Sequence, residues 1–194
     1  THPPEITDEE LSEITHTDDT IDGSWFDQFQ EFPKWEDIMD NWINGHPSSR
    51  MPPIAIGNID KYSSHIIGSS NDPTGAPYLW KGLVVGNVQS GKTATYTGLI
   101  GKAIDVGYRI IIIMSGRMNS LRYQTESRIS NQIVGVSNDE RSISVDDSII
   151  PLTTLHIDGD FGAEESPLPS ASLMSRVMTN SDSCLIGVIK KHPA

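Results

Sequence analysis

The sequence predicts an α/β fold in which helices flank a parallel β-sheet, and three observations support this class. A glycine-rich segment lies between a short apolar run and a helical pattern over residues 83–104. An isoleucine-rich run follows at 108–114, which is typical of a strand buried on both faces of a parallel sheet. A third apolar run at 184–189 predicts another strand. Because predicted strands alternate with predicted helices, crossover connections are expected.

The charge of the chain is distributed unevenly. The 194 residues carry a net charge of -12, and residues 1–50 hold 13 acidic side chains against two basic ones. The region 81–128 is locally basic, which permits a phosphate-rich partner such as DNA there. No apolar stretch reaches the length of a membrane span and no secretory signal begins the sequence, so we expect a cytoplasmic protein with no membrane partner.

Residues 1–50 are expected to form an acidic, partly helical N-terminal extension. Thr7 and Glu10 fit a capping box. Apolar side chains then recur with helical spacing over 35–43, before Asn44 and Gly45 end the pattern. This aromatic stripe predicts a helix packed onto the core, and docking onto a protein partner is the alternative. Proline, glycine and serine are frequent in residues 51–77, which predicts a linker with at most one short helix or strand, before a main domain at 78–194.

The glycine-rich segment matches the phosphate-binding pattern G-x-x-x-x-G-K-[ST] at every fixed position. It consists of Gly86, Asn87, Val88, Gln89, Ser90, Gly91, Lys92 and Thr93. In such a P-loop, backbone N–H groups surround the phosphates, the lysine reaches the β- and γ-phosphates, and the hydroxyl binds Mg²⁺. We therefore expect ATP and Mg²⁺ as cofactors, with Lys92 and Thr93 as the catalytic residues and Thr93 as the Mg²⁺ ligand. A strand at 83–85 and a helix at 93–104, with its positive dipole end at the phosphates, complete the expected site.

A second strand, turn and helix follow at 108–129. The turn Ser115-Gly116 leads into a helix at 119–129, in which Arg122 and Glu126 are spaced to pair. This arrangement resembles motif Ia of superfamily-two helicases. The resemblance implies that four residues contact a nucleic-acid backbone: Ser115, Gly116, Asn119 and Arg122.

Taken together, residues 80–93 and 98–109 resemble the Z-one domain family (letter Z, numeral one). The family contains helicase-related P-loop ATPases with a RecA-like fold from bacteria and phages, often described as endonucleases and associated with restriction and DNA conflict. The resemblance implies a DNA-dependent hydrolase, of which this chain is the N-terminal part. It also implies that the Walker B acids follow a segment like 189–191 and lie beyond this sequence. Three internal carboxylates remain weaker candidates for that role: Asp146, Asp147 and Asp158.

Two other functions remain open from the sequence. A non-catalytic nucleotide-sensing module would use the helix at 35–43 for docking, and a small-molecule phosphotransferase would need a basic lid. The histidines do not occur at metal-ligand spacing, and the single cysteine, Cys184, is expected to be a buried structural thiol. Arg109 is expected to be a surface charge at a strand edge.

Overall fold

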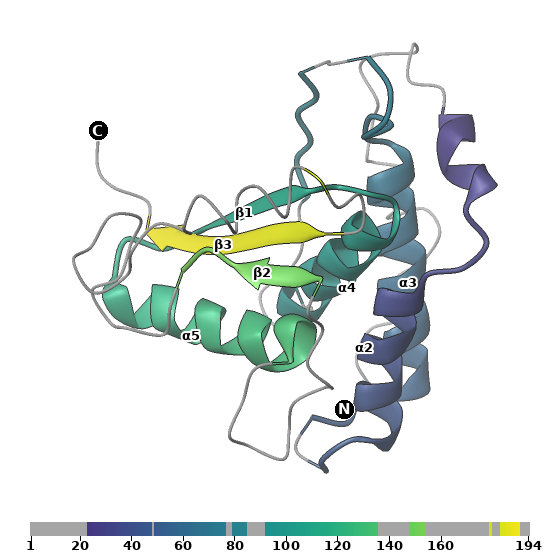
Figure 1. Ribbon diagram of the computed structural model, residues 1–194. Coiled ribbons are helices and arrows are strands. Elements are labelled where there is room, and N and C mark those ends of the chain that lie inside the picture. Colours follow the sequence, from purple (N-terminus) through teal and green to yellow (C-terminus); the bar gives the residue numbers. More distant parts are fainter. Residues whose placement is uncertain are drawn as a thin grey trace.

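The computed structural model describes residues 23–47, 49–76, 79–84, 92–135, 148–153, 179 and 183–190. A 3₁₀-helix and a π-helical turn accompany the α-helices and strands (Figure 1). In chain order the elements are η1 (Gly23–Gln28), α2 (Pro33–Asn44), α3 (Pro53–Gly68), α4 (Lys92–Asp105), β1 (Ile110–Ser115), α5 (Asn119–Ile129), η2 (Ser130–Val134), β2 (Ile149–Pro151) and β3 (Cys184–Lys190). The predicted helices at 35–43, 93–104 and 119–129 are therefore confirmed as α2, α4 and α5.

The three strands form one parallel sheet in the order β1-β3-β2. Ile110 pairs with Leu185, and Ile149 pairs with Cys184. The helix α5 lies along one face of this sheet, and α2 and α3 run side by side at its end (Figure 1). The strands predicted at 108–114 and 184–189 are confirmed, and the α/β class with a helix-flanked parallel sheet is observed.

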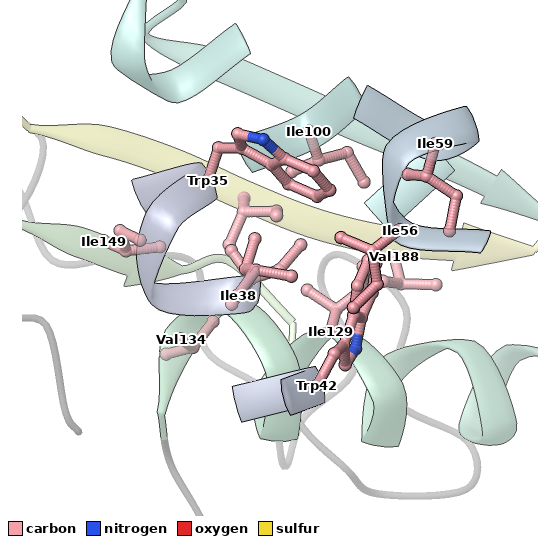
Figure 2. Packing of buried hydrophobic residues seen from close by; sticks show 12 residues of the cluster. Trp35, Ile38, Trp42, Ile56, Ile59, Ile100, Ile129, Val134, Ile149 and Val188 are labelled. Carbon is pink, nitrogen blue, oxygen red and sulfur yellow. The ribbon is translucent and has the colours of Figure 1, made fainter. Parts of the chain in front are cut away.

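The main hydrophobic cluster joins the helices to the sheet (Figure 2). Trp35 and Trp42 of α2 pack edge to face, with ring centroids 5.6 Å apart. They belong to a cluster whose other buried members come from α2 itself and from α3, α4, α5, η2, β2 and β3: Ile38, Ile56, Ile59, Ile100, Ile129, Ile133, Val134, Ile149, Ile186 and Val188. The prediction that the aromatic stripe belongs to the core is confirmed.

The prediction of a linker with at most one short element over 51–77 is wrong for residues 53–68. These residues form α3, which packs against α4. An ionic contact between a buried lysine and a half-exposed aspartate supports this packing: Lys102 Nζ of α4 lies 2.6 Å from Asp60 Oδ1 and 2.9 Å from Asp60 O, and also contacts Ser64 Oγ. Burial lowers the pKa of Lys102, whereas Asp60 opposes that shift.

Asp105 at the end of α4 fixes the start of α2. Its Oδ1 and Oδ2 accept hydrogen bonds from Lys34 N and Trp35 N at 2.8 and 3.0 Å. These are N–H groups that the first turn of a helix cannot satisfy internally. Burial raises the pKa of Asp105 to about 6, although the two N–H groups oppose the shift. Beyond Asp105, Gly107 has a φ of 96°, a backbone conformation that glycine adopts readily, and it turns the chain toward β1.

Two predictions about strands do not hold. Residues 83 and 84 lie outside any strand, and the side chain of Leu83 is 81% exposed. The strand β1 is not buried on both faces, because Ile110 and Met114 are 60% and 63% exposed. The opposite face of β1 carries Ile111 and Ile113, which pack against the main cluster. Isoleucine repeats alone therefore did not show which face the helices cover.

Candidate nucleotide-binding site

The end of the phosphate-binding pattern coincides with the start of a helix. Lys92 is the first residue of α4, and Thr93 follows in its first turn. Lys92 is exposed and Thr93 is half-buried. The unpaired N–H groups of a first turn and the helix dipole favour anions at this position. Residues 86–91 of the pattern lie outside the described residues.

Arg128 is a neighbour of this site that the sequence did not reveal. Its Nη1 donates a hydrogen bond to Thr93 Oγ1 over 3.0 Å, across 35 positions in sequence. One turn further along α4, Thr97 Oγ1 donates to Thr93 O at 3.0 Å. An arginine at the hydroxyl that is expected to bind Mg²⁺ adds positive charge next to the phosphate position. No local pattern marks Arg128, because it reaches Thr93 only through tertiary packing, in which η2, the continuation of α5, contacts α4.

The expected nucleic-acid contacts are placed at the other end of α5. Ser115 ends β1, and its Oγ donates to Ile189 O at 3.1 Å. Gly116 is exposed, and Asn119 is the first residue of α5. Asn119 and Arg128 are nine positions apart on one helix, so about 14 Å of helix axis separates the two groups of residues. The structure brings together Ser115, Gly116 and Asn119, but not with Lys92 and Thr93.

Arg122 differs from the other three expected contacts because its side chain is fully buried. Its Nη1 lies 3.3 Å from Glu126 Oε2, which confirms the predicted pair four positions apart. Burial raises the pKa of Glu126, against the effects of Thr153 and Arg122. In this arrangement the Arg122 side chain pairs with Glu126 inside the fold, and a contact between its guanidinium and a phosphodiester stays a prediction.

The remaining site predictions concern metal ligands and acids. In the ranges that the structure describes, no group of three or more His, Cys, Asp or Glu side chains is placed to hold a metal ion. Asp146, Asp147 and Asp158, the internal candidates for a Walker B acid, lie outside those ranges. Cys184 is buried as predicted, and burial raises its pKa to about 12 against the influence of Arg109. The described helices include none that is long and apolar enough to cross a membrane.

Comparisons with models of protein families, with curated proteins and with solved structures found no significant match to this chain.

Proposed function

We propose that this chain is the ATP-binding portion of a nucleic-acid-dependent, helicase-like ATPase or translocase. The observation that carries the proposal is the complete phosphate-binding pattern at 86–93, whose last two residues begin the helix α4. A P-loop requires a helix at this position, because the helix dipole and the first-turn N–H groups act on the bound phosphates. A parallel sheet with flanking helices is compatible with this class of site.

The residues at the start of α4 fit magnesium-ATP. Lys92 is exposed in the first turn and would bind the β- and γ-phosphates, and the hydroxyl of Thr93 would be the protein ligand of Mg²⁺. Mg²⁺ typically takes phosphate oxygens and water as its other ligands, and it would neutralise charge on the phosphates. Arg128 already donates to the Thr93 hydroxyl, so a bound nucleotide offers its guanidinium a phosphate oxygen as an alternative partner.

DNA is the proposed second partner of this site. The turn at Ser115 and Gly116 and the start of α5 at Asn119 present polar groups at the end of a strand, as the helicase resemblance implies. The resemblance of residues 80–93 and 98–109 to the Z-one domain family is the basis for proposing a restriction or defence protein with endonuclease activity, and we propose the cytoplasm as its location. Hydrolysis further requires a carboxylate that completes the Mg²⁺ shell.

The proposal is tested by titrating the complete chain with magnesium-ATP in a calorimeter. Replacing Lys92 by alanine removes a charged partner of the phosphates, and we expect affinity to fall about 10- to 100-fold. Lys61→Ala is the matched control, because Lys61 is also an exposed helical lysine but lies on α3. Both variants should keep the far-ultraviolet circular dichroism of the unmodified chain. Equal ATP affinity of Lys92→Ala and the unmodified chain would overturn the P-loop assignment.

A second measurement distinguishes an ATPase from a nucleotide sensor. Phosphate release by the whole protein is followed with and without DNA, over a series of salt concentrations. A DNA-dependent ATPase shows stimulation that weakens as salt rises, because counterion release contributes to DNA binding. Nucleotide binding without phosphate release would instead identify a sensing module, and turnover on small acceptors without DNA would identify a phosphotransferase.

A further inference from the structure

Two contacts with matching spacing join α4 to the last turn of α5 and to η2. Arg128 Nη1 donates to Thr93 Oγ1 over 3.0 Å, and Thr97 Oγ1 lies 3.4 Å from Gln132 Oε1. Thr93 and Thr97 are four positions apart in the sequence, and so are Arg128 and Gln132. Because residues four positions apart lie on the same face of a helix, the two contacts follow one seam between these elements.

The inner part of this seam is held by the core. Thr97 is fully buried, and Ile129 and Val134, at either end of η2, belong to the main hydrophobic cluster (Figure 2). Arg128, in contrast, is exposed at the solvent side of the seam. Its guanidinium can therefore exchange one hydrogen-bond partner for another without any change in the core.

The Thr93 hydroxyl is the group that the P-loop pattern assigns to Mg²⁺. A hydroxyl oxygen has two lone pairs, and one of them accepts the hydrogen bond from Arg128. The guanidinium keeps its positive charge at every physiological pH, and positive charges a few ångströms apart repel each other. The observed contact of Arg128 therefore competes with a Mg²⁺ ion on the same oxygen.

The terminal phosphate of ATP is a stronger partner for Arg128 than the hydroxyl of Thr93. Its oxygens are negatively charged, and a guanidinium can bind them through two parallel N–H···O bonds. In P-loop enzymes the metal bridges the β- and γ-phosphates, so the γ-phosphate lies close to the threonine that binds the metal. ADP has no γ-phosphate. Arg128 thus gains a replacement for Thr93 from ATP that ADP does not offer.

We propose that Arg128 distinguishes ATP from ADP by exchanging the Thr93 hydroxyl for the terminal phosphate of magnesium-ATP. The inference rests on the proposed nucleotide site, and it adds to that site a binding residue from another helix, outside the pattern at 86–93. The two cations then have different effects. Lys92 binds the β- and γ-phosphates and contributes to the affinity for both nucleotides, whereas Arg128 contributes to the affinity for the triphosphate.

The test is calorimetric titration of the complete chain with magnesium-ATP and, separately, with magnesium-ADP. In Arg128→Gln we expect ATP affinity to fall about tenfold, and ADP affinity to stay within about twofold, because only the bond to the terminal phosphate is lost. Lys92→Ala should weaken the binding of both nucleotides. Arg117→Gln is the matched control, because Arg117 is also exposed but precedes α5 at its opposite end. Far-ultraviolet circular dichroism shows whether each variant is folded.

A second readout follows the guanidinium itself. In the ¹⁵N-labelled chain, the Nε–H signal that is missing from Arg128→Gln belongs to Arg128. We expect this signal to shift when magnesium-ATP is added to the unmodified chain, because the guanidinium changes its partner. A signal that does not move at saturating magnesium-ATP would contradict the exchange.

The binding data separate this proposal from the nucleotide site on which it rests. The role of Arg128 is overturned if folded Arg128→Gln keeps the ATP affinity of the unmodified chain. It is also overturned if the variant loses affinity for both nucleotides to the same degree, since Arg128 would then only support Thr93. Failure of the nucleotide site gives a different result: the unmodified chain binds neither nucleotide, or Lys92→Ala binds both as tightly as the unmodified chain. Either of these results overturns both proposals.

Discussion

At the scale of single residues, the hydroxyl of Thr153, two positions after β2, makes two buried hydrogen bonds. The backbone ladder beside β3 continues past Pro151 through Leu152 N, which donates to Ile186 O at 2.7 Å. The next donor, Val188 N, has the Thr153 hydroxyl as its acceptor at 2.9 Å. The same hydroxyl donates to Glu126 Oε2 of α5 at 2.7 Å. One oxygen atom thus links the central strand to the helix below it.

Replacing Thr153 by valine should destabilise the protein. The variant keeps the side-chain shape but leaves Val188 N–H and Glu126 each without one buried partner, which costs about 2–4 kcal/mol in the free energy of unfolding. Thr153→Ser retains the hydroxyl and should lose only about 1 kcal/mol, for one methyl group. Urea denaturation followed by circular dichroism measures both. A valine variant as stable as the serine variant would contradict this role of the hydroxyl.

At the scale of helices, α4 approaches its neighbours closely because it carries two glycines on its buried face. A Cβ atom on Gly98 would lie 2.8 Å from Ile59 Cγ2, and one on Gly101 would lie 2.7 Å from Ile38 Cδ1. Such distances are too short for carbon atoms that are not bonded, so a side chain at either position would force its neighbours to move; at Gly101 the neighbour is only the terminal methyl group of Ile38, whereas at Gly98 the Trp35 ring also lies 3.0 Å away. The two glycines let α4 contact both α3 and α2.

Gly98→Ala and Gly57→Ala should therefore shift stability in opposite directions. Both glycines lie inside helices, where alanine is intrinsically favoured by about 1 kcal/mol. At Gly57 nothing lies within 4 Å of an added Cβ, so that variant should gain this amount. At Gly98 the clash should outweigh the gain and give a net loss of about 1–3 kcal/mol. Thermal unfolding of both variants is the measurement, and stabilisation by Gly98→Ala would contradict the packing described here.

Helices were predictable from the sequence where their apolar spacing was regular, as in α2. The helix α3 was not, because prolines at 52 and 53 and Gly57 indicated a linker. Both prolines lie at the helix start, where the missing N–H costs nothing. The buried positions of α3 do follow a helical period, but they include a serine: Ile56, Ile59, Ser63 and Ile67. The strand expected at 83–85 is not present at residues 83 and 84. Three consecutive apolar residues do not show whether a neighbouring strand is available for pairing.

At the scale of the whole molecule, the sequence predicts those features of the candidate sites that consecutive residues form. The pattern at 86–93 and the helix after it could be read from consecutive residues. The contact of Arg128 with Thr93 could not, because it depends on the packing of helices 35 positions apart in sequence. The contact between Thr97 and Gln132 likewise depends on the packing of α4 against η2. Chain topology, and not residue type, brings those groups together.

The main hydrophobic cluster, which contains Trp42, predicts that α2 and the sheet unfold together. Trp42 is 1% exposed and shares this cluster with Val188 of the central strand. Trp42→Ala should cost about 3–5 kcal/mol, a large part of the 5–15 kcal/mol by which domains are typically stable. Ile43→Ala, next on the same helix but 51% exposed, should cost less than about 1 kcal/mol. Hydrogen exchange should show α2 and β3 losing protection together in Trp42→Ala; loss confined to α2 would show instead that the helices and the sheet are separate folding units.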